Sequence, residues 1–204
     1  MVRMTLARDD DTPDEIWFLE HPPVFTLGLA GRREHLLDPG PIPVVQSDRG
    51  GQVTYHGPGQ LVSYLLLDLK RRGTSIRTLV SHMEQAVIDM LAEQGLMAAR
   101  TPGAPGVYID GKKIAALGVR VRNGCCYHGL ALNVAMDTGP FLRIHPCGYP
   151  GLGVTQLREQ GSTMSVAQAA DALLPRLLHH LGYSGYNVAC SEESGDALPV
   201  PLAS

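Results

Sequence analysis

The spacing of hydrophobic residues changes several times along the chain and separates predicted strands from predicted helices. Residues 16–19 and 24–27 are short apolar runs on either side of a turn with two prolines, a pattern typical of strands. Val44 and Val45 indicate a further short strand. Residues 61–69 are almost continuously apolar, which predicts a strand buried on both faces.

Two segments have a helical period instead. Between residues 75 and 95 apolar side chains recur every three or four positions, and Gly95 is a natural C-terminal stop. A second helix is predicted from residue 165, where Ser165 and Gln168 form a capping box before another apolar stripe. Each predicted helix therefore buries one side.

Further strands are predicted between the two helices. Residues 107–109 and 113–121 flank Asp110-Gly111, a pair that favours the type I′ turn of a hairpin. Residues 127–134 follow as another strand. Strands, a helix, more strands and a second helix in this order predict an α+β sheet protein.

Two segments are predicted to be irregular. Residues 138–153 are rich in glycine and proline, and the tail after Asn187 has no sustained period and contains Pro199 and Pro201. The chain of 204 residues suits one domain, or one large and one small lobe, with a substantial core. We therefore predict a single domain over residues 1–204.

Composition and charge exclude several classes of protein. A net charge of −3 argues against a nucleic-acid or membrane-surface protein, because both carry a basic patch. The chain has no apolar run long enough to span a membrane, and its first residues lack the apolar stretch of a signal peptide. The four cysteines are irregularly spaced, unlike a disulfide framework. These features predict a soluble cytoplasmic protein with reduced thiols.

A glycine-rich segment marks the predicted pocket. Residues 49–59 contain four glycines among polar side chains and lead directly into the buried strand. Glycine lets the backbone approach a ligand closely, and loops at the edge of a sheet often form binding sites. The segment predicts a site without identifying its chemistry.

Cys147 and Lys113 are the residues that would supply chemistry. Most cysteines are small buried hydrophobic residues, but Cys147 lies between Pro146 and Gly148 in the irregular loop, where a sharp bend would expose the thiol. A free thiol is mostly protonated at neutral pH and needs an activating neighbour. Strand alternation groups Lys113 with Ala115 and favours an inward side chain, although lysines near turns are usually solvated.

Other candidates carry weaker signals. Residues 106–113 resemble a phosphate-binding loop, but no Ser or Thr follows the lysine. The pairs Cys126/His128 and His145/Cys147 are spaced more closely than structural zinc ligands, so we expect no metal. Structural roles are the more common ones for several further histidines and cysteines, namely His56, His128, His179, His180, Cys125, Cys126 and Cys190.

Four motifs together closely resemble the lipoyl(octanoyl) transferase family. They are Arg-Gly-Gly-Gln-Val-Thr-Tyr-His-Gly-Pro-Gly-Gln-Leu at 49–61, Gly-Val-Tyr-Ile-Asp-Gly-Lys-Lys-Ile-Ala-Ala-Leu-Gly at 106–118, His-Gly-Leu-Ala-Leu-Asn at 128–133 and Pro-Cys-Gly at 146–148. The resemblance runs from about residue 14 to residue 182, in the family's order and spacing. The family normally has a further strand and a longer helix at its start, so we expect a short N-terminus and a missing edge strand.

The resemblance implies a fold and a reaction. The fold is a mixed β-sheet core with flanking helices and a smaller sheet, as in the catalytic domain of lipoate and biotin protein ligases. Cys147 takes an octanoyl group from octanoyl-acyl carrier protein as a thioester, and Lys113 assists by favouring the thiolate and moving protons. The acceptors are lysines in the lipoyl domains of 2-oxoacid dehydrogenases and in the glycine cleavage H protein. No ATP, metal, nucleic acid or membrane is implied.

The resemblance also implies a substrate pocket. Small residues leave room for an eight-carbon chain, and each buried methylene contributes about 0.8 kcal/mol. The positions that match the family's binding segments are Arg49, Gly50, Gly51, Gln52, Val53, Thr54, Tyr55, His56, Ala116, Leu117, Gly118, Gly129, Leu130 and Ala131.

Two alternatives share parts of this pattern. An ATP-dependent lipoate- or biotin-protein ligase also has an Arg-Gly-Gly loop and a pocket lysine, but it needs no nucleophile at Cys147. A non-catalytic module that binds lipoyl domains or fatty acids would keep the pocket and lose Cys147 or Lys113. Because both residues are present, we favour the transferase.

Overall fold

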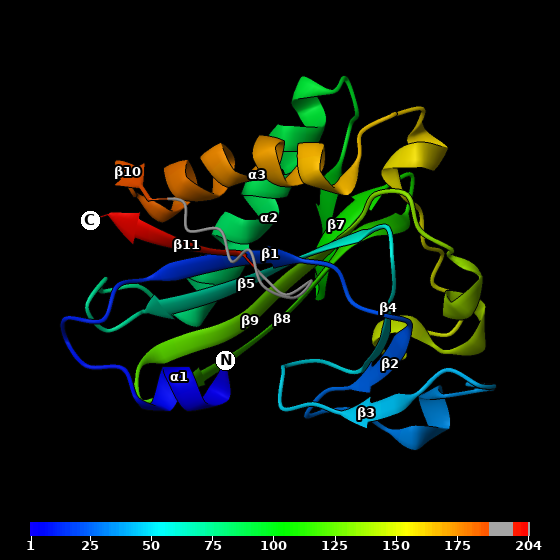
Figure 1. Cartoon of the computed structure of the whole chain (residues 1–204). Coiled ribbons are helices and arrows are strands. Elements are labelled where there is room, and N and C mark those ends of the chain that lie inside the picture. The colour runs from blue at the N-terminus through cyan, green and yellow to red at the C-terminus, as the bar shows by residue number, and fades with distance from the viewer. Residues whose placement is uncertain (188–197, 204) are drawn as a thin grey trace.

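A computed structural model describes residues 1–187 and 198–203 and places them in two sheets and three α-helices (Figure 1). The larger sheet has eight strands in the order β10-β11-β1-β5-β9-β8-β7-β6, and the smaller has three in the order β3-β2-β4. The strands of the larger sheet are β1 (Glu15–Leu19), β5 (Gln60–Asp68), β6 (Ala99–Thr101), β7 (Ala104–Ile109), β8 (Lys112–Arg122), β9 (Cys125–Asn133), β10 (Gly185–Tyr186) and β11 (Leu198–Ala203).

The predicted fold class is confirmed, and the parallel pairing lies in the smaller sheet. The pairings within the larger sheet are antiparallel. In the smaller sheet, β2 (Val24–Leu27) pairs parallel with β3 (Val44–Gln46) and antiparallel with β4 (Val53–His56). Short turns such as the one between β7 and β8 can join only antiparallel strands. Asp110 and Gly111 in that turn both have positive φ, as the type I′ prediction requires.

Two helices cover one face of the larger sheet. They are α2 (Ile76–Glu93) and α3 (Val166–Leu181), and they pack against each other above β1 and β5 (Figure 1). Ser75 caps α2 by accepting from Thr78 N, and Ser165 and Gln168 form the predicted capping box. The helix boundaries therefore follow the local signals in the sequence.

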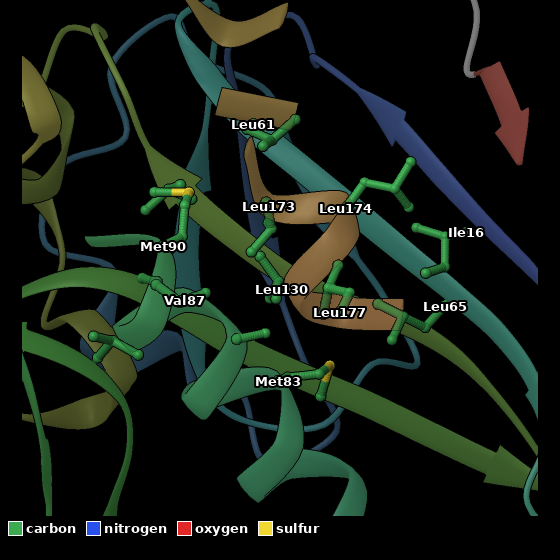
Figure 2. Packing of buried hydrophobic residues seen from close by; sticks show 14 of the residues in the cluster. Ile16, Leu61, Leu65, Met83, Val87, Met90, Leu130, Leu173, Leu174 and Leu177 are labelled. Atoms are coloured by element: carbon green, nitrogen blue, oxygen red, sulfur yellow. The ribbon is translucent and has the colours of Figure 1, made fainter. Parts of the chain in front are cut away.

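The main core lies between these helices and the sheet. Leucine side chains from both helices and methionine side chains from α2 meet apolar residues of β1, β5 and β9, as Figure 2 shows for Met83, Leu177 and Leu65. A second, smaller core forms under the small sheet around Phe25, Tyr55 and Phe141. The two cores explain why most of the predicted strands are strongly apolar.

The two ends of the chain differ from the sequence prediction. Residues 198–203 form β11, which pairs with β1 along Phe18–Glu15, so the prediction of a loop there was wrong. Proline can occupy a strand where its missing N–H faces an open edge, and the pattern of the chain does not show which edge is open. At the other end, α1 (Val2–Leu6) is a short helix that the sequence did not indicate. The predicted structural role of Cys190 lies outside the described residues.

Asp14 joins several segments of the larger sheet. Its buried carboxylate accepts from Arg8 Nη2 at 2.6 Å and from Arg71 Nη2 at 2.8 Å. It also accepts from the backbone N–H of Asp68 and from the hydroxyl of Tyr183. One carboxylate therefore connects the N-terminal segment, the end of β5 and the segment after α3.

Replacing Asp14 with alanine is expected to destabilise the fold by about 3–5 kcal/mol, because the Arg8 guanidinium would remain buried without its counter-ion. Urea unfolding would measure this loss. Glu93→Ala removes an ion pair whose partners are partly exposed and is expected to cost less than about 1 kcal/mol. Equal effects of the two substitutions would contradict this role for Asp14.

Candidate active site

Cys147 has a strained backbone at the edge of a cavity. It lies in a short 3₁₀ helix, η3 (Pro146–Gly148), with φ 56° and ψ 17°. Residues other than glycine rarely occupy this left-handed region, and those that do are often at functional sites. Gly148 follows with φ 79°, and a Cβ there would lie 3.2 Å from Cγ of Gln52. The sharp bend predicted from Pro146 and Gly148 is therefore confirmed.

Lys113 meets Cys147 directly. Its Nζ donates to Cys147 Sγ at 2.9 Å and to the carbonyl of Pro105 at 3.0 Å. The same atom lies 5.2 Å from the centre of the Tyr108 ring. The lysine side chain is buried, whereas the cysteine is half-buried. The structure thus brings together the two residues that the sequence singled out for chemistry.

The pKa of Lys113 reflects its contact with Cys147. Burial by itself lowers the pKa of this ammonium, but the negative charge of Cys147 and the hydrogen bonds to its sulfur and to Tyr108 outweigh burial. The pKa of Lys113 is therefore raised above its ordinary value. The lysine stays protonated at neutral pH as long as the sulfur beside it is a thiolate.

A β-bulge in β8 turns Lys113 toward the cavity. Val107 pairs with Ala115, but the next residue, Tyr108, pairs with Lys113, so β8 contains one extra residue at Ile114. As a result Ile114 and Ala115 both belong to the main core. The inward position of Lys113 is confirmed, but the bulge separates it from Ala115, with which strict alternation had grouped it.

The cavity next to the pair has a volume of about 940 Å³. It lies between the smaller sheet and strands β5, β8 and β9, and both Lys113 and Cys147 line it. All the residues that the family resemblance implied for binding line this cavity except Tyr55. The space is of the size that drug-sized ligands occupy.

Tyr55 does not line the cavity as expected, whereas Arg49 lines it and also binds the protein's own backbone. The Tyr55 ring packs 5.5 Å from Phe25 and from Phe141 in the smaller core, because it points to the opposite face of β4. The guanidinium of Arg49 donates to Thr26 O at 2.6 Å and to Gln52 O at 2.7 Å. Burial lowers its pKa to about 10. Arg49 therefore holds the glycine-rich loop together from inside.

The glycines allow this loop to lie directly on β8. Gly50 N donates to Val119 O at 3.2 Å, and a Cβ on Gly50 would lie 2.9 Å from the same oxygen. A Cβ on Gly118 would lie 2.8 Å from Gly50 O. The close approach predicted at these positions therefore occurs between two stretches of backbone that together form a cavity wall.

Polar side chains on the cavity wall were only partly anticipated. His21 Nε2 lies 2.6 Å from the hydroxyl of Tyr64, and His128 Nε2 lies 2.9 Å from Asp48 Oδ1. Burial lowers the pKa of His21 and, despite the carboxylate of Asp48, that of His128. His21 lies in Glu20-His21-Pro22-Pro23, a segment that also resembles the family, but the sequence assigned no site role to His21, Tyr64 or Asp48, because their grouping depends on segments distant in the sequence.

His56 remains neutral over a wide pH range. Its Nδ1 donates to Gln60 Oε1 at 2.7 Å, because the amide nitrogen of Gln60 is itself directed to Asn133. Burial lowers the pKa of His56 to about 4. Its Nε2 therefore has a free lone pair, and the contact to Gln60 agrees with the structural role predicted for this histidine.

The neutral state of His56 makes stability depend on pH. Above its ordinary pKa of 6.5 the histidine is neutral in the folded and the unfolded chain, so stability is fully present there. Between pH 6.5 and about 4 only the unfolded chain binds the proton, so stability falls as the pH falls. We expect the wild type to lose about 2 kcal/mol more between pH 7 and pH 5 than His56→Gln in urea unfolding. Identical pH dependence would contradict this expectation.

Two further findings concern metals and membranes. Among residues 1–187 and 198–203, no three His, Cys, Asp or Glu side chains form a group able to hold a metal ion. Within the same residues, none of the helices combines the length and the hydrophobicity needed to cross a membrane.

Sequence comparison relates the chain to a family and to curated relatives. Residues 2–178 match the lipoyl protein ligase A/B catalytic domain. The chain is 59% identical to an octanoyltransferase of Pseudomonas fluorescens (strain Pf0-1) over 184 residues, which cover 90% of this chain and 86% of the relative. It is also 59% identical to an octanoyltransferase of Chromobacterium violaceum, covering 90% of this chain and 89% of the relative.

Solved structures with low sequence identity share the fold. A lipoate-protein ligase A bound with ATP has a TM-score of 0.73 at 17% identity, covering 88% of this chain and 77% of its own. A bipartite lipoate protein ligase from Thermoplasma acidophilum, studied with its E2 lipoyl domain, has a TM-score of 0.71 at 18% identity and covers 93% and 79%. The biotin protein ligase of Aquifex aeolicus has a TM-score of 0.52 at 17% identity and covers 80% and 70%.

Proposed function

Since this chain belongs to the octanoyltransferases of the lipoyl protein ligase A/B catalytic domain family, we propose that it transfers an octanoyl group through a thioester on Cys147. The donor is octanoyl-acyl carrier protein and the acceptor is the lysine of a lipoyl domain. The observation that carries the proposal is the 2.9 Å contact between Lys113 Nζ and Cys147 Sγ at the edge of the cavity. A thiolate next to an ammonium is the form in which cysteine acts as a nucleophile.

In the first step the Cys147 thiolate attacks the carbonyl carbon of the donor thioester. A new carbon–sulfur bond forms to Cys147, the bond to the carrier's sulfur breaks, and the carrier's thiolate takes a proton from Lys113 and leaves as a thiol. The octanoyl chain occupies the apolar part of the cavity, where each buried methylene contributes about 0.8 kcal/mol.

Acylation changes the acid–base properties of Lys113. Once the sulfur is a thioester, the negative charge that raised the pKa of Lys113 is gone, while burial, which lowers it, remains. Lys113 then gives up its proton more readily and becomes a base when the acceptor lysine enters. The position of Lys113 beside Cys147 thus favours the thiolate nucleophile before acylation and allows Lys113 to act as a base after it.

In the second step the acceptor's ε-amine attacks the octanoyl carbonyl of the enzyme. The amide bond forms, the bond to Cys147 breaks, and Cys147 leaves as a thiolate. Lys113 takes the proton that the amine loses and becomes an ammonium again. The enzyme returns to its starting state without consuming ATP or using a metal.

Acceptors of the kind proposed have a parallel among the related structures. The Thermoplasma ligase that shares the fold was studied with its E2 lipoyl domain. We propose that lipoyl domains of 2-oxoacid dehydrogenases and the glycine cleavage H protein are the acceptors here. The reduced thiol that the reaction needs agrees with the cytoplasmic location predicted from composition.

The competing function is an ATP-dependent lipoate-protein ligase. It has support from the fold, because a lipoate-protein ligase A bound with ATP has a similar structure. That similarity is at 17% identity, whereas the octanoyltransferases are 59% identical. A ligase would also have no use for the contact between Lys113 and Cys147.

Intact-mass spectrometry tests the proposal. The protein is incubated with octanoyl-acyl carrier protein in the absence of ATP, and the site of any adduct is then mapped by peptide mass. The expected result is that Cys147 gains the mass of one octanoyl group. When a lipoyl domain is added, this adduct should disappear from the enzyme and the lipoyl domain should gain the same mass. Absence of the adduct, together with lipoyl-domain modification that requires free octanoate and ATP, would overturn the proposal.

A further inference from the structure

One peptide group connects Lys113 to a buried carboxylate on α2. The carbonyl of Pro105 accepts from Lys113 Nζ at 3.0 Å, and the N–H of the next residue, Gly106, donates to Glu84 Oε1 at 2.9 Å. This carbonyl and this N–H belong to the same planar unit and point in opposite directions. Lys113 and Glu84 therefore hold the two ends of one rigid group.

Glu84 is held firmly in this position. Its side chain is buried, and its second oxygen accepts from Arg100 Nε on β6 at 3.0 Å. A hydrogen bond from an amide to a carboxylate is stronger than one between neutral groups. It also polarises the peptide, so that the carbonyl at the other end becomes a better acceptor. The negative charge of Glu84 thus acts on Lys113 through the peptide.

The surroundings of this peptide leave it little freedom. Gly106 has φ 142°, and a Cβ there would lie 3.0 Å from Cε and 3.2 Å from Nζ of Lys113. The hydroxyl of Tyr108 donates to Ala104 O at 2.9 Å and holds the preceding backbone. The segment of residues 104–106 is therefore shaped so that its peptide reaches the lysine.

We propose that Glu84 is a positioning residue, which acts through the Pro105–Gly106 peptide to hold the Lys113 ammonium against the sulfur of Cys147. The inference rests on the proposed function, in which this pair carries out the transfer. The ionisable groups around the pair and its anchor include Tyr108, which faces Lys113, Arg49 near Cys147, and Arg100 beside Glu84. On the side of the Cys147 loop they also include His35, His145 and Tyr149.

Alkylation of Cys147 by iodoacetamide over a range of pH tests the role of Glu84. Glu84→Gln keeps an oxygen for Gly106 but removes the charge, so the ammonium and hence the thiolate are less favoured. We expect alkylation at neutral pH to slow about three- to tenfold, which corresponds to the free energy of one hydrogen bond. The increase of the alkylation rate with pH should occur at higher pH than in the wild type. In Lys113→Met the same substitution should have no further effect, because the group that Glu84 holds is absent.

Asp89→Asn is the matched control. It is the same chemical change on the same helix, but Asp89 contacts His180 and Gln85 and has no link to Lys113. It should leave the alkylation profile unchanged. A folded Glu84→Gln with the wild-type profile would overturn the inference. An equal slowing by Glu84→Gln in the presence and absence of Lys113 would also overturn it.

A measurement on the wild type covers the case in which Glu84→Gln fails to fold. Lys113 Nζ donates both to Cys147 Sγ and to the carbonyl of Pro105. Alkylating Cys147 removes the thiolate, so the hydrogen bond from Lys113 to Pro105 changes. The NMR signal of the Gly106 amide proton, on the same peptide group, should therefore shift. An unchanged Gly106 signal would overturn the inference. Since neither experiment uses an octanoyl donor, a missing octanoyl adduct with normal alkylation would count against the proposed function and not against Glu84.

Discussion

Cys147→Ser is expected to abolish octanoyl transfer, with a loss of about 10³-fold or more in turnover with octanoyl-acyl carrier protein. Serine fills almost the same space and can still accept from Lys113 Nζ, so the cavity is preserved. A serine hydroxyl is, however, a much weaker nucleophile than a cysteine sulfur and needs a base to be activated. The loss therefore reports on nucleophilicity. Product formation on a lipoyl domain, followed by mass spectrometry, measures it.

Cys125→Ser serves as the control for this substitution. Cys125 is also unpaired, but it is buried on β9, and burial raises the pKa of its thiol. Its replacement should leave transfer close to the wild-type rate. Transfer by Cys147→Ser at the wild-type rate would mean that the acyl group never passes through the sulfur.

Lys113→Met is expected to slow formation of the octanoyl adduct by about 10²–10⁴-fold at pH 7, the usual contribution of a positioned acid–base group. The methionine preserves much of the length of the side chain but has neither charge nor proton. Without the ammonium, the thiolate loses the neighbouring positive charge that stabilises it. We therefore expect the rate in the variant to depend more steeply on pH than the rate in the wild type.

Lys112→Met separates this effect from a general loss of positive charge. Lys112 precedes Lys113 on β8, but its side chain is exposed. We expect adduct formation in this variant to match the wild type at each pH. If Lys112→Met and Lys113→Met slow the reaction equally, the contact with Cys147 is not the cause.

Local signals predicted the regular elements well. The capping box of Ser165 and Gln168 starts α3, the helical period from residue 75 corresponds to α2, and Asp110-Gly111 makes the predicted turn. Each of these signals acts over a few residues, so neighbouring sequence determines the outcome. Residues 198–203 were predicted wrongly because β11 is defined by its partner β1, which lies far away in the sequence, while the rest of the predicted tail loop, residues 188–197 and 204, lies outside the described residues.

The chemistry was predicted better than the shape of the pocket. Motifs identified Cys147 and Lys113, and the structure places their side chains in contact. The same motifs assigned both Tyr55 and Arg49 to the pocket and did not show which other residues they contact. Tyr55 points into the smaller core, and the guanidinium of Arg49 donates hydrogen bonds to the backbone carbonyls of Thr26 and Gln52. A motif identifies a position but not the direction in which its side chain points.

What the sequence determined alone is the set of reactive groups and the elements that carry them, because residue type and local backbone preference are properties of short segments. Only the tertiary structure decided that Lys113 faces the cavity, since the β-bulge that turns it depends on the register of β8 with β7. Only the packing of α2 against β7 brings the carboxylate of Glu84 to the peptide that holds this lysine. Hydrogen bonds of about 3 Å between residues distant in the chain require the whole core to be formed, and no local pattern encodes them.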